Sequence, residues 1–313
     1  MDCKVSSLIL YAKDVYKFFG KIKALDGLNL KFDGGVLGFI GPNGAGKTTT
    51  LNLIAGFIKP DGGSIEVFGM NPWDERHNLF RRMALLPDEL EFPSYLTGYD
   101  VLRGEARLYG LDNIDDVVRD VAHRVNIEWA LNQRIGTYSM GMYKRLLIVR
   151  TFLNPDVEFV VLDEPFSNID VESIILITKF IMEEVERGVN FLIASHVLPH
   201  LLSICDHFSF IHRGKIIADG DVNRLAGFVD EFKYLIRFRG DPPDNLDIIS
   251  TSKYIIEYSV DRLGLHITTR DPSNALKDIF RFLIGDGSNV IEVSLYPDLL
   301  TQIFINLGME YEG

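Results

Sequence analysis

Short apolar runs rich in β-branched residues alternate with longer segments of helical period from Val36 to about Asp219. This alternation is typical of a mostly parallel β-sheet covered by helices. The apolar runs predict strands at residues 36–40, 83–87, 158–162, 190–195 and 208–212. We therefore expect an α/β fold for this part of the chain.

A purely helical pattern interrupts the alternation between about residues 90 and 151. The segments YDVLRGEARLYG, IDDVVRDVAHRVNI and YKRLLIVRTFL read as helices, and no strand pattern lies between them. After Gly220 the order changes to three strands, a helix, a strand and a helix, with a loop predicted for GDPPDN. The pattern thus predicts an α/β domain over residues 1–224, which carries the helical subdomain, and a small α+β domain over residues 225–313.

Composition and charge narrow the range of functions. The length of 313 residues suggests about two domains, and 47% hydrophobic with 24% charged residues is ordinary for a globular protein. The formal net charge of −12 argues against a broad nucleic-acid surface, which needs clustered Lys and Arg, and leaves room only for a local basic patch.

Cysteine usage and hydropathy indicate the compartment. Cys3 and Cys205 are too few for a disulfide framework, so we interpret both as inert thiols in a reducing compartment. No window reaches the roughly 18 apolar residues of a spanning helix, since even SIILITKFIM contains Lys179. The start of the sequence lacks the pattern of a secretory signal. We expect a cytoplasmic protein.

A glycine-rich loop between a predicted strand and a predicted helix is the strongest motif. The segment GPNGAGKTTT satisfies the pattern G-x-x-x-x-G-K-[ST], in which backbone N–H groups cradle phosphates and glycines allow the close approach. We expect Lys47 to reach the β- and γ-phosphates and the hydroxyl of Thr48 to bind magnesium. The predicted phosphate-binding residues are Gly41, Pro42, Asn43, Gly44, Ala45, Gly46, Lys47, Thr48 and Thr49.

Two further strands end in residues suited to phosphoanhydride hydrolysis. Asp163 and Glu164 follow the strand EFVVL, so Asp163 is expected to hold magnesium, directly or through water, and Glu164 to act as the general base on an attacking water. His196 follows the strand NFLIAS and is expected to touch the γ-phosphate or to hold the water. His196 and His200 do not predict a metal site, because Pro199 disturbs their helix and no third ligand has suitable spacing.

Together these motifs resemble the ATP-binding subunit of an ABC transporter, over roughly residues 8–221. The family's signature, LSGGQ, resembles YSMGM in the helical insertion, where Ser139 and Gly141 are retained and Met140 and Met142 depart from the pattern. In the family this signature binds the γ-phosphate held by a partner molecule. The resemblance therefore implies ATP and magnesium as cofactors and a P-loop ATPase of ABC type. It also implies a second protomer, in a homodimer, and a separate membrane permease, with the chain peripheral on the cytoplasmic face of the membrane.

The resemblance assigns three more features. Asp88 stands where the family usually has a glutamine that contacts magnesium, so the resemblance implies Asp88 as a further magnesium ligand, directly or through water. Asp170 in SNID resembles the residue near the dimer contact. Phe19 is the expected adenine-stacking residue, with Phe18 and Tyr16 as alternatives. The tail SLYPDLLTQIFINLGM resembles those of ATPase subunits in drug and antibiotic export systems, which favours export. For the C-terminal segment itself we expect a stabilising or dimer-contacting role in preference to a specific effector site.

The alternative function is an ABC-type ATPase that acts on nucleic acid or ribosomes. Repair members of that class carry long coiled-coil insertions before the signature, whereas only 139 − 47 = 92 residues separate Lys47 from Ser139 here. Ribosome-acting members usually carry two ATPase domains, and this chain carries one phosphate loop. Together with the acidic charge, these features favour transport and argue against a nucleic-acid partner.

Overall fold

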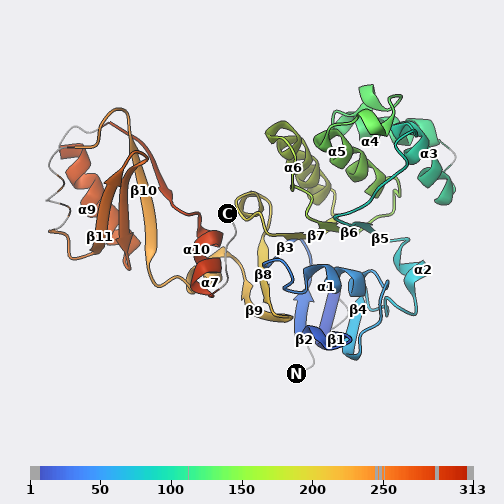
Figure 1. Cartoon of the computed structure of the whole chain (residues 1–313), viewed down its shortest axis with the longest axis horizontal. Coiled ribbons are helices and arrows are strands. Elements are labelled where there is room, and N and C mark those ends of the chain that lie inside the picture. Colours follow the sequence, from blue (N-terminus) through green and yellow to red (C-terminus); the bar gives the residue numbers. More distant parts are fainter. Residues whose placement is uncertain are drawn as a thin grey trace. The chain divides into compact units, whose positions relative to one another are not determined.

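The computed structural model describes residues 8–308, apart from 112, 244–245, 247–248, 250 and 286–288. Cys3 and part of the predicted loop GDPPDN lie outside the described residues. The chain forms two compact units, Met1–Asp221 and Val222–Gly313 (Figure 1). The sequence pattern predicts the boundary between the two domains after residue 224.

The first unit is built around a six-stranded sheet with the order β5-β6-β7-β3-β8-β9. All five strands predicted for this sheet are confirmed and run parallel to their neighbours, and β9 closes the edge antiparallel to β8. Every residue of β3 and β6 is buried, as expected for a parallel sheet covered on both faces. The strands are β3 (Val36–Ile40), β5 (Met83–Leu86), β6 (Phe159–Asp163), β7 (Asn190–Ser195), β8 (His207–His212) and β9 (Lys215–Gly220).

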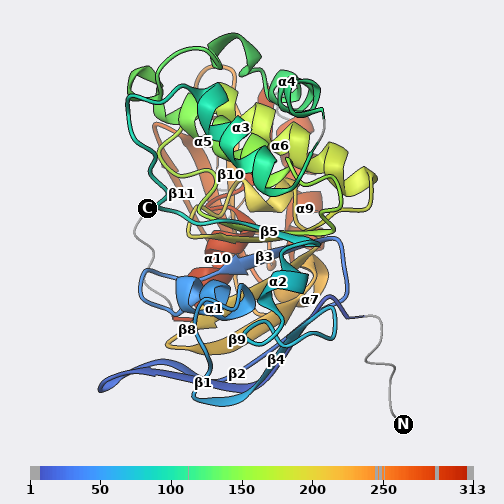
Figure 2. The same cartoon turned by 90° about the vertical axis from the view of Figure 1, so that its right-hand side faces the viewer.

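Helices cover both faces of this sheet. Figures 1 and 2 show α1 and a small antiparallel sheet on one face and helices α3 to α6 on the other. A capping box formed by Thr97 and Asp100 starts α3, and Ser139 caps α5. Short 3₁₀ turns lie at Glu128–Ala130, Ile135–Thr137 and Leu201–Ser203. The helices are α1 (Lys47–Ile54), α2 (Arg76–Leu79), α3 (Gly98–Leu108), α4 (Ile114–Arg124), α5 (Met140–Thr151) and α6 (Val171–Glu186).

The small antiparallel sheet, with the order β2-β1-β4, was not predicted from the sequence. It comprises β1 (Leu10–Phe19), β2 (Ile22–Phe32) and β4 (Gly62–Val67). Register shifts along β1, next to Asp14 with its φ of 48°, break the two-residue period by which such strands are detected. The buried face of this sheet shares one apolar core with β3 and β6, where the rings of Phe32 and Phe159 lie 6.0 Å apart.

The second unit is an antiparallel sheet of order β11-β12-β10-β13 with helices, in the element order predicted from the sequence apart from α7, which was not predicted. Helix α9 supplies Ile279 and Leu283 to a core that it shares with Ile236, Leu265 and Ile267. The elements are α7 (Val222–Ala226), β10 (Phe232–Phe238), β11 (Ile255–Asp261), β12 (Gly264–Thr269), α9 (Pro272–Gly285), β13 (Val290–Leu295) and α10 (Leu299–Asn306). Among the described residues of both units, no helix combines the length and hydropathy needed to cross a bilayer.

Candidate nucleotide-hydrolysis site

Strand register brings the predicted site residues of the first unit together. Ile40 at the end of β3 pairs with Ser195 of β7, and Asp163 at the end of β6 pairs with Ala194. The segments that follow these strands therefore meet at one edge of the sheet, where open α/β folds bind ligands. A pocket of about 240 Å³ lies there. Its lining is Ile22, Lys23, Ala24, Pro42, Asn43, Gly44, Gly46, Lys47, Thr48, Thr49, Asp88, Asp163 and Glu164.

The glycines of the phosphate loop are required by its packing. A Cβ atom at Gly41 would clash with the carbonyl oxygen of Ile211, and one at Gly46 would lie 2.8 Å from the carbonyl oxygen of Ala24. Gly46 also has a φ of 110°, which side chains rarely adopt. Gly41 and Ala45 do not line the pocket, while the other predicted loop residues do.

Lys47 lies almost fully buried at the base of this pocket, with 7% of its surface exposed. Its Nζ donates to the carbonyl oxygen of Gly41 at 2.7 Å and lies 3.7 Å from Oε1 of Glu164. Burial lowers the pKa of Lys47, and the carboxylates of Glu164 and Asp163 oppose this change. The ammonium group is thus held by the loop's own backbone, at a position where phosphate oxygens would offer better acceptors.

Thr48 and Asp163 form a hydrogen-bonded pair and, with Asp88 in the same pocket lining, are the residues expected to hold magnesium. The hydroxyl of Thr48 donates to Oδ2 of Asp163 at 3.0 Å. Burial raises the pKa of Asp163 to about 6, while the hydrogen bond from Thr48 acts in the opposite direction. Two oxygen ligands beside a phosphate pocket suit magnesium, which commonly takes one or two protein ligands together with phosphates and water. Within the described residues no group of three or more His, Cys, Asp or Glu side chains is arranged to hold a metal ion.

Glu164 is the most extensively hydrogen-bonded side chain of the site. Its Oε2 accepts from the hydroxyls of Ser195 at 3.0 Å and Ser167 at 3.1 Å. Its Oε1 accepts from the backbone N–H of His196 at 3.1 Å and lies 2.7 Å from Nδ1 of the same residue. The sequence motifs do not mark Ser195 or Ser167 as residues of the site. The available signal was that each is a hydroxyl residue within three positions of a predicted catalytic residue.

Ser139 and Gly141 do not line this pocket. Ser139 is exposed, and its hydroxyl oxygen accepts from the backbone N–H of Met142 at 3.2 Å, as a helix cap does. Gly141 packs against the same chain, because a Cβ atom there would clash with the side chains of Asp170 and Ser173. Any substitution of Gly141 therefore disturbs the chain's own packing, whether or not a partner binds there.

The aromatic candidates for adenine differ in their surroundings. Phe19 at the end of β1 is 49% exposed and Phe18 is 42% exposed, and neither lines the pocket, although Ile22, just beyond the turn, does. The ring of Tyr16 packs against Gly27 and Gly62, so it is less available. The geometry leaves Phe19 and Phe18 as the candidates for stacking on adenine.

Comparisons with known proteins match residues 25–167 to the ABC transporter family. The ABC transporter ATP-binding protein NatA of Bacillus subtilis (strain 168) is 30% identical over 208 residues, which are 65% of this chain and 84% of that protein. The chain belongs to the ABC transporter ATP-binding subunits. The bacitracin transport ATP-binding protein BcrA of Bacillus licheniformis is 29% identical over 308 residues, 96% of this chain and 97% of that protein. A solved structure of an ATP-binding subunit of an ABC transporter matches with a TM-score of 0.64 and 26% identity, covering 70% of this chain and 92% of that one.

This family membership identifies the chemistry of the pocket. The ABC subunit is an ATPase, and subunits of its family work with a membrane permease. Its fold is the one expected from the sequence, a P-loop α/β domain with a helical insertion.

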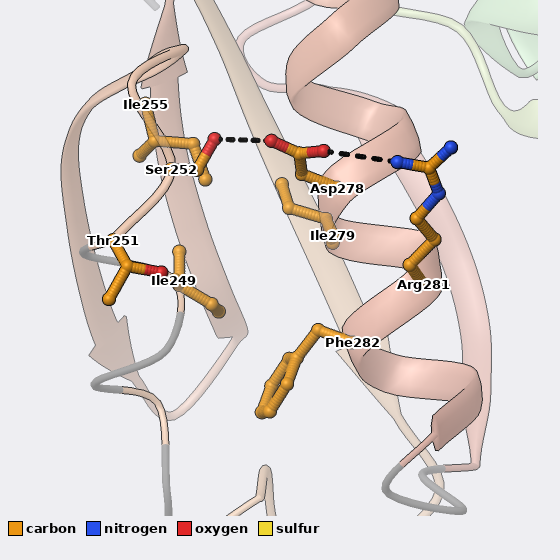
Figure 3. Close-up of a pocket in the computed structure, with 8 residues that line it drawn as sticks. All are labelled: Ile249, Thr251, Ser252, Ile255, Asp278, Ile279, Arg281 and Phe282. Atoms are coloured by element: carbon orange, nitrogen blue, oxygen red, sulfur yellow. Dashed lines mark hydrogen bonds and ion pairs between the residues drawn. The ribbon is translucent and has the colours of Figure 1, made fainter.

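A second pocket, of about 280 Å³, lies in the C-terminal unit of the ABC subunit, between α9 and the residues before β11 (Figure 3). Its apolar side chains include Ile249 and Ile279. Its carboxylate, Asp278, accepts from the hydroxyl of Ser252 at 2.8 Å and lies 3.8 Å from Nη1 of Arg281. Because that charge already has partners in the protein, the pocket offers no polar group that requires a ligand.

The raised pKa of Asp163 leads to a prediction on stability. Burial makes the charged carboxylate unfavourable in the folded state, so Asp163→Asn should stabilise the nucleotide-free ABC subunit at pH 8, by about 1–3 kcal/mol. The gain should shrink as the pH falls from about 6 towards the ordinary value of 3.8, because the wild-type carboxyl becomes protonated. Thermal melting of both proteins across this range measures the difference.

Asp61→Asn is the control, because a hydrogen bond from Phe18 N–H lowers the pKa of Asp61, so this substitution should not stabilise the protein. A melting difference between Asp163→Asn and wild type that is independent of pH would contradict the account.

Proposed function

We propose that two copies of this ABC subunit close on magnesium-bound ATP, hydrolyse it through Glu164, and drive export through a separate membrane permease. The observation that carries the proposal is the Glu164 carboxylate, fixed by hydrogen bonds and 3.7 Å from the phosphate-loop lysine Lys47. A general base must be held within reach of the water that it activates, and this arrangement meets that need.

In the proposed reaction the phosphate loop and Lys47 hold the β- and γ-phosphates. Thr48 and Asp163 would hold magnesium, which, when bound, neutralises charge on the phosphate oxygens. Glu164 accepts the proton of the attacking water. Nδ1 of His196 lies against Glu164, so Nε2 is the ring nitrogen left to contact the γ-phosphate or the water.

We propose that Phe19 stacks on the adenine ring. It is the more exposed of the two remaining candidates and ends the strand that leads into the pocket wall. A flat aromatic face is sufficient for such a contact, which is worth roughly 1–3 kcal/mol per base.

The second protomer is proposed because the signature residues lie apart from the pocket of their own chain. Ser139 begins the twelve-residue helix α5 with an exposed hydroxyl, and the N-terminus of a helix favours anions such as phosphate. While its oxygen accepts from Met142 N–H, the hydroxyl hydrogen of Ser139 stays available to a phosphate. ATP would then bind between two chains and favour the closed dimer.

The proposed direction of transport and the proposed location of the protein rest on similarity to other ATP-binding subunits. The C-terminal tail resembles those of drug and antibiotic export subunits. The alignment with the bacitracin transport subunit spans 96% of this chain, so the similarity extends into the second unit. We propose that the dimer is a homodimer and lies peripherally on the cytoplasmic face of the membrane, against its permease.

The assignment of Glu164 as the base predicts a separation of binding from turnover. Glu164→Gln keeps one carbonyl oxygen that can accept from the hydroxyls of both Ser195 and Ser167, but its amide cannot take a proton at neutral pH. We expect ATP binding to persist while hydrolysis falls at least about 100-fold. Equilibrium ATP binding and phosphate release on the same preparation provide the measurement. Turnover at the wild-type rate would show that another group is the base.

Mixed dimers test the second protomer. Aspartate caps helices as well as serine, so Ser139→Asp should preserve α5 while placing a negative charge against the partner's γ-phosphate. Lys47→Ala removes a phosphate contact of the chain's own loop. Each homodimer should be nearly inactive, and mixing them should restore up to about half the activity per mixed dimer, because one intact composite site remains.

The matched control for Ser139→Asp is Ser139→Asn, which caps equally well without charge and should retain more activity. Phosphate release from separate and mixed preparations is the measurement. If Ser139→Asp alone hydrolyses ATP like wild type, Ser139 is only a helix cap.

A further inference from the structure

Lys144 is a buried cation beside the hydrolysis site, with 5% of its surface exposed. It lies on α5, and its Nζ donates to the backbone carbonyl of Glu164 at 3.1 Å. The same Nζ lies 3.4 Å from the carbonyl oxygen and 3.5 Å from Oδ1 of Asp88. A buried ammonium group is costly unless its three donors find acceptors, and these oxygens provide them.

The first contact acts on the backbone of the proposed base. Glu164 has a φ of 48°, a conformation that is costly for a residue with a long side chain and persists only when its surroundings fix it. The N–H of Glu164 donates to the carbonyl oxygen of Ala194 at 2.9 Å, and its own carbonyl oxygen accepts from Nζ of Lys144 at 3.1 Å and from the N–H of Ser167 at 3.4 Å. Removal of the Lys144 ammonium would leave this carbonyl only its longer contact with Ser167, so the backbone that carries the carboxylate could shift.

The second contact, between Lys144 and Asp88, places a positive charge next to a negative one beside the pocket. Asp88 lines the nucleotide pocket together with Asp163 and Glu164, so three carboxylates share one small volume. Asp88 and Glu164 each contribute to the raised pKa of Asp163. The positive charge of Lys144 opposes the charge of Asp88 next to the pocket, where ATP brings further negative charge.

We propose that Lys144 is a positioning residue for hydrolysis: it fixes the backbone of Glu164 and neutralises Asp88, and thereby ties helix α5 to the site of its own chain. The proposal rests on the proposed function of that site. Ser139 begins the same helix, less than about two turns away. One rigid helix thus joins the residue that faces the partner's nucleotide to the residue that holds the chain's own base.

A double-mutant cycle tests this proposal. Lys144→Met removes the ammonium group and should lower kcat at least about 10-fold, as expected when a catalytic group is misplaced, with KM for ATP changed less than kcat. Lys144→Gln keeps one donor for the Glu164 carbonyl and should lose less. Asp88→Asn in the Lys144→Met background should recover about 3-fold, because it removes the uncompensated charge, instead of adding a further loss.

Arg150→Met is the matched control. Arg150 lies on the same helix and pairs with Glu105 at 2.6 Å, away from the pocket lining. Its removal should lower the melting temperature while kcat stays within about 2-fold of wild type. Melting temperature and kcat are therefore measured for every variant. If Lys144→Met does not fold, the comparison of Lys144→Gln with Asp88→Asn and their double variant carries the same test.

The outcomes separate this proposal from the one on which it rests. A wild-type protein that binds no ATP would contradict the proposed function. A wild-type protein that hydrolyses ATP, with Lys144→Met or Lys144→Gln equally active, would overturn the role of Lys144 alone. Losses of kcat in Lys144→Met and Asp88→Asn that add fully in the double variant would also overturn this role. So would a loss of kcat in Arg150→Met as large as that in Lys144→Met. Either result would indicate that Lys144 contributes only to structure.

Discussion

The pairing register of three parallel strands determines where the chemistry of this ABC subunit can occur. Ile40 of β3 pairs with Ser195 of β7, and Asp163 of β6 pairs with Ala194 of the same strand. A shift of one residue along any of these strands would turn its side chains to the other face of the sheet. Because all three strands are almost entirely buried, the apolar core holds that register, and the core thereby positions the loops that carry polar groups.

Within that frame the site concentrates opposite charges in a small buried volume. Lys47 is surrounded by Glu164, Asp163 and its own loop carbonyls, and burial shifts the pKa of Lys47 downwards and that of Asp163 upwards. Both shifts show that the charged forms are unfavourable without a ligand. Magnesium and ATP together would supply the missing opposite charges, which explains why a protein would retain so costly an arrangement.

The sequence predicted the parallel sheet, the helical insertion and the phosphate loop, because each depends on local patterns such as buried apolar runs, helical period and obligatory glycines. It did not reveal the β1–β2–β4 sheet, whose bulges hide its period, nor the contacts of Ser195, Ser167 and Lys144 with Glu164. These contacts join residues up to 31 positions apart, so only the folded chain brings them together. Gly141 shows the opposite case, since its packing against Asp170 gives a structural reason for a glycine that the signature pattern alone had attributed to phosphate.

A crystal structure with magnesium and a non-hydrolysable ATP analogue would show whether this buried cluster is the nucleotide site. We predict that Nζ of Lys47 leaves the Gly41 carbonyl for the terminal phosphate, and that the metal binds the oxygens of Thr48 and Asp163. We also predict that Glu164 keeps its contacts with Ser195 and His196 and faces the terminal phosphate. Phosphates bound outside the loop, or a metal held without Asp163, would contradict the account.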